Sequence, residues 1–527
     1  MSALPGAVIP FLCSVWLAAS AAASGGITED RRTAPPDSVR VMAFNIEWGG
    51  THVSFDKVVE AIRKADPDIV AVQEAEGNLA RLAAEFGWYY DLRNHVIARH
   101  RLIDAPGAGG RYVLAEVHPG FVVAVANVHL PSDPYGEDWI RDGRSVGEVL
   151  ALEQRVRLPA IRPFLEKLPQ LAADGVPVFL AGDFNSPSHE DWGPAAIERW
   201  PFRRFRVEWP VARAIHSAGF RDSYRYRHPD PLEHPGFTWW ASRPKIEDYN
   251  PGPPDAWQSR IDFIWYAGPA EVIQSTLAGE PEAPGVTIAV TPWPSDHRAV
   301  VSDFTVEPAP MPPLVAPSRR LYRSGERASI VYNNRTSAGM LVIAPATADI
   351  GHGEPWRRIE TTERRGEVAL DVLPPATGEY VVVLTDNEDR IVSQGQMWVL
   401  PVDARPVLET RRESYAQDEP LSVRWRNAPG NRYDWVAIYP EGASEREAYL
   451  AWAHTGASIQ GEIMLDAAHA VAAWPLPPGR YTASLLADDG FELLAASAPF
   501  DIRAPGDAGT HVKPRLRTAN RLPRSTP

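Results

Sequence analysis

The chain has 527 residues, and its 67 acidic and 53 basic side chains give a formal net charge of −14. This length predicts two to four domains, and a hydrophobic content of 44% excludes a wholly disordered chain. The negative charge argues against tight nonspecific binding of duplex DNA, which needs many cationic contacts to phosphates. A nuclease is not excluded, because a bound metal ion and a local arginine cluster reverse the field at a site.

The first 24 residues have the pattern of an export signal. A short apolar run, Val8 to Ala19, precedes small residues that end at Ala23-Ser24, as in a signal peptide with an Ala-x-Ala cleavage site. The run is too short to span a membrane comfortably. We therefore expect a signal peptide over 1–24 and export to the periplasm or the medium. The single cysteine, Cys13, lies in this segment, so we expect no disulfide in the mature chain.

After a polar leader over 25–37, apolar runs alternate with helical patterns. Phe55, Val58, Val59 and Ile62 follow helical spacing, and 78–86 and 147–168 also read as helices. This alternation predicts a layered α/β domain over 38–305. The runs that read as buried strands are Val39–Ala43, Asp68–Val72, Phe121–Ala126, Val176–Leu180 and Ile261–Trp265.

Short polar motifs stand on or just after several of these runs. Carboxylates, carboxamides and imidazoles at the ends of several strands would converge at one end of the sheet structure. Such a set suits a hard divalent cation beside a phosphate ester. Side chains two positions apart along a strand face the same side, so Asn45 is expected to face the site with Glu47, and Asp183 with Asn185. The motifs are Phe44-Asn45-Ile46-Glu47, Val72-Gln73-Glu74, Asn127-Val128-His129-Leu130, Gly182-Asp183-Phe184-Asn185, Arg260-Ile261-Asp262-Phe263 and Ser295-Asp296-His297.

In this order the six motifs resemble those of the endonuclease/exonuclease/phosphatase superfamily of metal-dependent phosphoesterases, over about residues 38–305. The resemblance implies a four-layer α/β/β/α sandwich. It also implies hydrolysis of phosphodiester or phosphomonoester bonds by a metal- and histidine-assisted attack of water. The metal ligands that it implies are Asn45, Glu47, Glu74 and Asp296, with Glu74 as the principal one.

The resemblance also implies catalytic roles. Asp183 orients or deprotonates the attacking water, and Asn185 holds phosphate oxygens. His129 donates to the phosphate or to the leaving oxygen. His297 contacts the scissile phosphate, with Asp262 behind its other ring nitrogen.

Oxygen-rich donors without cysteine indicate Mg²⁺, with Mn²⁺ or Ca²⁺ as substitutes, rather than structural zinc. The sequence leaves open whether one or two cations operate, and whether His297 acts as a base or as a charged electrophile. Arg99, at the end of another apolar run, is either a phosphate ligand or half of a surface ion pair.

A Pro-rich connector over 306–316 ends the catalytic domain. The helical signal then largely disappears, and two similar units follow over 317–402 and 403–503. Their short strands, separated by turn signals, predict two all-β sandwiches. The segment Asp434–Tyr439 resembles a motif of SKICH-like sandwich modules. The tail over 504–527 is basic and without apolar periodicity, and we expect it to be disordered.

The substrate is the least defined part of the prediction. Loops over 131–136, 236–240 and 249–257 are expected to shape the pocket. The leading interpretation is a general phosphoesterase that acts on a nucleic acid or a small phosphorylated molecule. The alternatives are an extracellular DNase-like nuclease and an inositol phosphate or phospholipid phosphoesterase. From another class, the chain is a surface- or glycan-binding β-sandwich protein with a degenerate catalytic domain. We expect a monomer without a membrane span that docks on surfaces through its sandwiches.

Overall fold

The computed structural model describes residues 37–242, 258–348, 355–445, 448–471 and 473–504. The predicted signal peptide lies outside these residues, as do the leader apart from Asp37, the 249–257 loop and the tail apart from Ala504. Within the described part of the chain, no helix combines the length and the apolar character that crossing a membrane requires.

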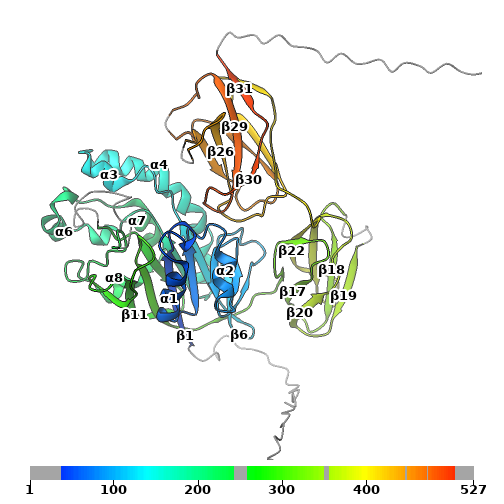
Figure 1. Cartoon of the computed structure of the whole chain (residues 1–527). Helices are drawn as coiled ribbons and strands as arrows, with labels where there is room; N and C mark the ends of the chain where they lie inside the picture. The colour runs from blue at the N-terminus through cyan, green and yellow to red at the C-terminus, as the bar shows by residue number, and fades with distance from the viewer. Residues whose placement is uncertain (1–36, 243–257, 349–354, 446–447, 472, 505–527) are drawn as a thin grey trace, which may run out of the picture. The chain divides into compact units, whose positions relative to one another are not determined.

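Two sheets form the centre of the N-terminal part of the chain (Figure 1). The first has the strand order β12 (Val286–Ala289), β11 (Ala270–Gly279), β13 (Ala299–Val306), β1 (Asp37–Asn45), β2 (Ile69–Gln73), β4 (Val96–Ala98), β3 (Tyr89–Asp91). The second has the order β5 (Arg101–Ile103), β6 (Val113–His118), β7 (Phe121–His129), β8 (Val178–Asp183), β10 (Asp262–Ala267), β9 (Arg221–Asp222), and β14 (Ala309–Pro310) also pairs with β7.

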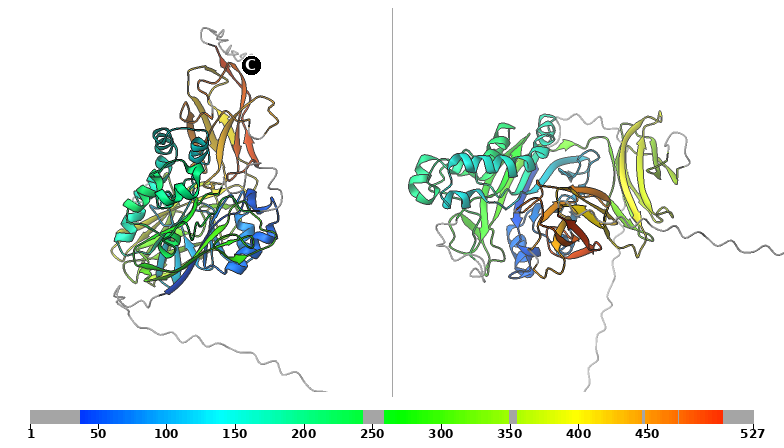
Figure 2. Two further views of the ribbon diagram at one scale, coloured as in Figure 1. Left: turned by 90° about the vertical axis from the view of Figure 1, so that its left-hand side faces the viewer. Right: turned by 90° about the horizontal axis from the view of Figure 1, so that it is seen from above.

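The two sheets pack face to face because their strands alternate apolar side chains toward both faces. Val41, Val125, Phe179 and Ile264 lie in the core between the sheets. The outer face of the first sheet packs on helices α1 (Phe55–Ala65) and α2 (Leu79–Ala84). The outer face of the second packs on α4 (Val146–Leu165), α5 (Leu168–Ala173) and α7 (Pro210–Ser217). Figure 2 (left) shows the strands between these helices, and the predicted α/β/β/α sandwich is confirmed.

The remaining short helices lie in the connections. They are η1 (Trp48–Gly50), α3 (Gly136–Arg141), η2 (His189–Asp191), α6 (Pro194–Arg199), η3 (Pro201–Arg203) and α8 (Ser223–Arg227).

The C-terminal part is all-β among its described residues, as predicted. The first sandwich pairs β15 (Leu314–Pro317), β17 (Ala328–Asn333) and β20 (Arg365–Leu370) in one sheet. Its other sheet is β16 (Leu321–Arg323), β22 (Ile391–Leu400), β21 (Gly378–Thr385), β18 (Gly339–Pro345), β19 (Arg357–Thr361). In the second sandwich the small sheet is β23 (Val407–Thr410), β25 (Leu421–Arg426), β28 (Gly461–Leu465). The large one is β24 (Ser414–Ala416), β31 (Phe500–Arg503), β29 (Gly479–Leu486), β26 (Trp435–Pro440), β27 (Ala451–His454), with β30 (Leu493–Ala496) on β29.

The sequence similarity of the two sandwich units has a structural reason. The Tyr380 hydroxyl donates to the carbonyl of Ala376 at 2.8 Å, and the Tyr481 hydroxyl donates to that of Pro477 at 2.7 Å. Each bond closes the Leu-Pro-Pro turn that precedes the long hairpin strand, in the manner of the tyrosine corner of β-sandwiches.

The Pro-rich connector is more than a linker, because part of it pairs with a strand of the catalytic domain. Ala309 and Pro310 pair with Val122 and Phe121 at β7, and Leu314 begins the first sandwich strand. The connector therefore extends the second catalytic sheet before the chain enters the sandwich.

Candidate active site

Three of the predicted site residues form a row across the second sheet. In the parallel pairing of β7 with β8, His129 lies opposite Asp183. In the antiparallel pairing of β8 with β10, Asp183 lies opposite Asp262. Both carboxylates are buried. Strand register thus brings together residues that are up to 133 positions apart in sequence.

The first sheet faces this row with Asn45, the last residue of β1, and Glu74, which directly follows β2. The Asn45 side-chain Nδ2 donates to Glu74 Oε1 at 2.9 Å and to Asp183 Oδ2 at 3.2 Å. Asn45 Oδ1 accepts the backbone N–H of Glu47 at 3.1 Å. Asn45 therefore links the carboxylates of the two sheets through its amide nitrogen, and its predicted role as a metal ligand stays a prediction.

Two further polar residues of the same motifs link the two sheets through hydrogen bonds. Gln73 Nε2 donates to Asn127 Oδ1 at 2.7 Å. Asn127 Nδ2 donates in turn to the carbonyls of Val72 and His95, both at 2.8 Å. All these polar side chains are buried, so their bonds fix the spacing of the strands that carry the site.

The Ser295-Asp296-His297 turn is held against the end of β1. Ser295 Oγ donates to the Asn45 carbonyl at 2.7 Å and accepts the His297 N–H at 3.0 Å. The Asp296 N–H donates to Glu47 Oε2 at 3.0 Å. Glu47 thus anchors the turn that presents His297, and its predicted role as a metal ligand stays a prediction.

Glu47 and Asn185 lie just beyond the ends of their strands, so strand alternation does not set the direction of their side chains. The side-chain Nδ2 of Asn185 nevertheless lies 3.4 Å from Asp183 Oδ2. Strands β1 and β8 end at Asn45 and Asp183. Glu47 and Asn185 have φ values of 53° and 46°, so the backbone turns sharply after each strand. Asn185 donates from its side chain to the Leu130 carbonyl at 3.0 Å and from its backbone to Asp183 Oδ1 at 2.8 Å.

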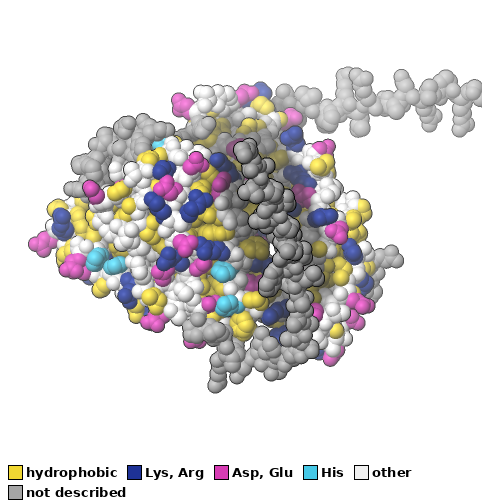
Figure 3. Space-filling model, turned by 60° about the horizontal axis from the view of Figure 1, so that its bottom comes forward, with side chains coloured by type: hydrophobic (Ala, Val, Ile, Leu, Met, Phe, Trp, Pro, Cys, Tyr) yellow, Lys and Arg dark blue, Asp and Glu magenta, His cyan; other side chains and the backbone are white. Residues whose placement is uncertain are grey.

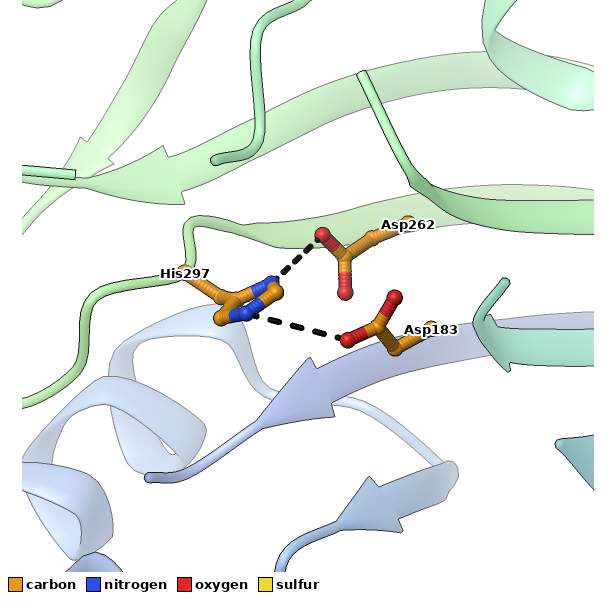
Figure 4. A group of neighbouring side chains, drawn as sticks. All are labelled: Asp183, Asp262 and His297. Atoms are coloured by element: carbon orange, nitrogen blue, oxygen red, sulfur yellow. Dashed lines mark hydrogen bonds and ion pairs between the residues drawn. The ribbon is translucent and has the colours of Figure 1, made fainter. Parts of the chain in front are cut away.

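His297 is paired with a carboxylate, as predicted. Its Nδ1 lies 2.9 Å from Asp262 Oδ2, and its Nε2 faces Asp183 Oδ2 at 3.7 Å (Figure 4). Burial acts to lower the pKa of His297, but the charges of Asp262, Asp296 and Asp183 raise that pKa well above its ordinary value. The carboxylates around the ring therefore favour its protonated form.

His129 mirrors this arrangement on the other side of Asp183. Its Nε2 lies 3.7 Å from Asp183 Oδ2 and 4.0 Å from Glu74 Oε1. Its Nδ1 contacts Asp489 at 2.7 Å. Burial opposes the charged ring, but Asp489, Asp183 and Glu74 raise the pKa of His129 to about 9.

Asp183 lies between the two imidazoles. Burial and the charge of Asp262 raise its pKa to about 6, against the opposing effect of His297 and His129. A carboxylate with this pKa is largely ionised at neutral pH and is still basic enough to accept a proton from water.

The carboxylates fit a hard cation. Among the described residues, none forms a hydrogen bond with the buried Oδ1 of Asp262. Ligand atoms of Asp183, Asp262 and His297 lie within 4.8 Å of one another. Because His297 and Asp262 already bond to each other, we favour Glu74 and Asp183, which share Asn45 Nδ2, as the carboxylates beside the cation. Asp296 Oδ2 accepts Trp239 Nε1 at 3.2 Å.

The arginines near the motifs have structural partners. Arg99 forms an ion pair with Asp66, and both side chains are exposed, which fits the surface-pair alternative. Arg260 is buried and lies 2.8 Å from Asp191 and 2.6 Å from Asp222. Its motif therefore marks a structural ion pair beside Asp262 rather than a phosphate ligand.

Sequence reasoning missed two groups at the site, the Asp489 carboxylate and the Tyr433 hydroxyl, which both come from the second sandwich. The hydroxyl accepts the backbone N–H of His129 at 3.0 Å. The one sequence signal is the turn Asp488-Asp489-Gly490, in which Asp489 follows Asp488 where the first repeat has Asn387 after Asp386.

Comparison with known proteins identifies the family of the catalytic domain. A sequence model described as the endonuclease/exonuclease/phosphatase family matches residues 42–297. A Caenorhabditis elegans protein, F14F9.5, is 30% identical over 301 residues, which are 51% of this chain and 92% of the worm protein. The chain belongs to the endonuclease/exonuclease/phosphatase superfamily, whose members are hydrolases of phosphoester bonds.

Solved structures with similarity include an endonuclease/exonuclease/phosphatase protein from Beutenbergia cavernae, with 16% identity and a TM-score of 0.31 over 68% of this chain and 99% of the other. The TDP2 protein of D. rerio, complexed with a single-strand DNA product, has 14% identity and a TM-score of 0.32 over 51% of this chain and 98% of its own.

Proposed function

We propose that the protein is an exported, divalent-metal-dependent phosphoesterase that hydrolyses phosphodiester or phosphomonoester bonds. The observation that carries the proposal is the placement of Asp183 Oδ2 at 3.7 Å from the Nε2 atoms of both His129 and His297. One basic carboxylate between two charged imidazoles offers a proton acceptor and two hydrogen-bond donors around a single position.

Three side chains of the chain have separate roles in this reaction. Asp183 accepts a proton from the attacking water, since its pKa of about 6 leaves it ionised at neutral pH. His297, oriented by Asp262, donates from Nε2 to a phosphoryl oxygen. His129 donates from its Nε2 to a second oxygen or to the leaving group.

A Mg²⁺ or Mn²⁺ ion would be held by Glu74, with Asp183 and the amide of Asn45 beside it. Such an ion supplies Lewis acidity that offsets negative charge on the phosphoryl oxygens. The carboxylate oxygens of Glu74 and Asp183 fit a hard cation better than a thiophilic one.

The test is hydrolysis of bis-p-nitrophenyl phosphate with Mg²⁺ or Mn²⁺. We expect EDTA, His297→Ala and Asp183→Ala each to abolish turnover. His118→Ala is the matched control, because His118 pairs with Asp37 at the surface, and it should keep full activity. Turnover that survives both site substitutions contradicts the assignment.

The leading alternative within the class is an extracellular nuclease. Acidic and basic side chains are interspersed on the face that Figure 3 shows, and the net charge of −14 disfavours a long duplex substrate. A panel of plasmid DNA, RNA, inositol phosphates, sphingomyelin and nucleotides ranks the candidates by kcat/KM. Export is tested by the N-terminal sequence of the secreted protein, which should begin after the predicted signal peptide over 1–24.

The binding-protein alternative predicts a degenerate site. The assembled row of His129, Asp183 and Asp262, with His297 bonded to Asp262, supports catalysis instead. Full-length protein that turns over no phosphate ester and binds glycans would favour the binding protein.

A further inference from the structure

A turn of the second sandwich reaches the candidate active site. It joins β29 to β30 and carries Asp488, Asp489 and Gly490. Asp489 Oδ2 lies 2.7 Å from His129 Nδ1, across 360 residues of sequence, and its Oδ1 lies 3.6 Å from His454 Nε2. The carboxylate thus contacts the predicted catalytic histidine directly.

Hydrogen bonds within the second sandwich hold the backbone of this turn in place. The Asp488 N–H donates to Asp434 Oδ1 at 3.1 Å, and the Asp489 N–H donates to the Tyr433 carbonyl at 2.9 Å. Trp435 Nε1 donates to the Gly490 carbonyl at 2.9 Å. With its backbone fixed at three successive residues, the turn presents Asp489 in one position rather than as a surface side chain that samples many.

Neighbouring contacts fix the same sandwich edge on the catalytic domain. Asp488 bonds to His95 and accepts the Gly77 N–H at 2.9 Å. Arg432 donates to the Asn127 carbonyl at 2.6 Å, two residues before His129. Asp488 and His95 are fully buried and Tyr433 is 5% exposed. These buried polar groups satisfy one another only when the sandwich is docked.

The first sandwich provides an internal comparison. At the equivalent turn between β21 and β22, the Asp386 carboxylate accepts the N–H groups of Glu388 and Arg390 at 2.9 and 3.0 Å. It also accepts Arg390 Nε at 2.9 Å. Asn387, next in the chain, is exposed. In the first sandwich the exposed Glu388 carboxylate of this turn pairs with Arg390 of the same turn, whereas Asp489 contacts His129 of the catalytic domain.

The role of Asp489 follows from the similar surroundings of the two histidines, His129 and His297. His297 has Asp262 at Nδ1, His129 has Asp489 at Nδ1, and both Nε2 atoms lie 3.7 Å from Asp183 Oδ2. A carboxylate at Nδ1 fixes the rotation of an imidazole and directs its other nitrogen. Each histidine has its own orienting carboxylate, but only that of His297 comes from the catalytic domain.

Resting on the proposed function, we propose that Asp489 is the positioning residue of His129, so that the second sandwich completes the active site. The phosphoesterase is then built from two domains of one chain. The sandwich supplies the carboxylate that aims His129 at the phosphate.

A double-mutant cycle tests the coupling in the full chain. Asp489→Asn keeps the size of the side chain, and we expect it to lower kcat about 10–100-fold with a small change in KM. In a His129→Ala background the same substitution should have little further effect on kcat. Asn387→Ala, at the equivalent turn of the first sandwich, is the matched control. Equal losses in both backgrounds, or no loss from Asp489→Asn, overturn the proposal and leave the proposed function intact.

A disulfide gives a readout that does not depend on activity. A Cβ placed on Gly490 would lie 3.3 Å from Glu76 Cβ, close to the spacing of about 3.8 Å in a disulfide. Glu76→Cys with Gly490→Cys, in a Cys13→Ser background, should crosslink on oxidation, as read by the mobility of proteolytic fragments. The crosslinked protein should keep its turnover. Failure to crosslink, or loss of turnover that reduction restores, overturns the docked active site. If the wild type turns over no phosphate ester, the proposed function fails while the crosslink still reports on docking.

Discussion

At the scale of single residues, the site depends on how buried charges are paired. Asp183, Asp262 and His297 are all buried, a placement that is costly for any of them alone. Each charge has an opposite charge nearby, and Asn45 donates through one nitrogen to the carboxylates of Asp183 and Glu74. Removal of one member therefore changes the protonation and orientation of the others.

Asp262→Asn tests the pairing of His297. The carboxamide keeps the shape of the side chain but lacks the negative charge that orients the His297 ring and raises its pKa. We expect kcat to fall about 10–100-fold, with a smaller change in KM. Steady-state kinetics on a nitrophenyl phosphodiester measure both. A KM effect alone would show that Asp262 acts in substrate binding.

Glu74→Gln tests the principal metal ligand. A cation that binds only the folded wild type at a hundredfold excess over its Kd stabilises it by about 2.7 kcal/mol. We therefore expect Mn²⁺ to raise the melting temperature of the wild type and to leave that of Glu74→Gln nearly unchanged. Calorimetry with and without EDTA measures the shift. An equal rise in both proteins contradicts the role of Glu74.

Asp191 gives a prediction for stability against pH. It lies 2.6 Å from Arg225 and 2.8 Å from Arg260. Burial acts to raise its pKa, but these guanidinium groups hold that pKa below the ordinary value of 3.8. Because the folded pKa is depressed, the stabilisation is complete above the unfolded pKa and is lost as the pH falls below 3.8 through the folded pKa.

Asp191→Asn should cost about 3–5 kcal/mol at pH 7, because it leaves buried guanidinium groups without their partner. The cost should be constant between pH 7 and 5 and shrink below pH 3.8. Denaturant unfolding at several pH values measures it, and the half-exposed Asp138 supplies the control Asp138→Asn. A cost that grows toward acid pH contradicts the sign.

At the scale of elements, the ends of the strands position the side chains of the site. The apolar runs predicted the strands β1, β2, β7, β8 and β10, because buried strands need continuous apolar faces. The sequence also predicted which polar residues end them. It did not predict that Glu47 and Asn185 lie beyond their strands with positive φ, because the period-two rule holds only while the strand continues.

The contact between Asp489 and His129 could not be predicted from the sequence, for a different reason. No local pattern relates it to His129, 360 residues away, and only the packing of the sandwich edge brings them together. Similarly, Arg260 stands in a motif beside Asp262, but its partners Asp191 and Asp222 come from distant segments. Its role follows from tertiary structure alone.

Gly182 is an element-scale test, because it lies in β8 with a φ of 137°. A Cβ there would lie 2.0 Å from the Val128 carbonyl oxygen on the neighbouring strand. Gly182→Ala should destabilise the protein by about 1–3 kcal/mol or more and lower kcat, since it shifts His129 against Asp183. Gly147→Ala, where a Cβ meets nothing within 4 Å, is the control. Equal unfolding midpoints for both variants contradict the close approach of β7 and β8.

At the scale of the whole molecule, two of the three layered units contribute residues to one site. The α/β/β/α sandwich supplies the row of His129, Asp183 and Asp262. The first sandwich follows the connector strand β14, which pairs with β7, and contacts the catalytic domain through the Arg101–Glu367 pair. The second sandwich contacts His129 itself. The sequence predicted all three folds but assigned the sandwiches only a docking role, since their turn residues carry no catalytic pattern of their own.

The central claim is that this site hydrolyses a phosphate ester by attack of water on phosphorus. The most direct measurement is the turnover of bis-p-nitrophenyl phosphate with Mn²⁺ in ¹⁸O-labelled water, followed by mass spectrometry of both products. We expect one ¹⁸O atom in the p-nitrophenyl phosphate, none in the nitrophenol, and no turnover by Asp183→Ala. Label in the nitrophenol, or labelled phosphate produced equally by Asp183→Ala, would contradict the account.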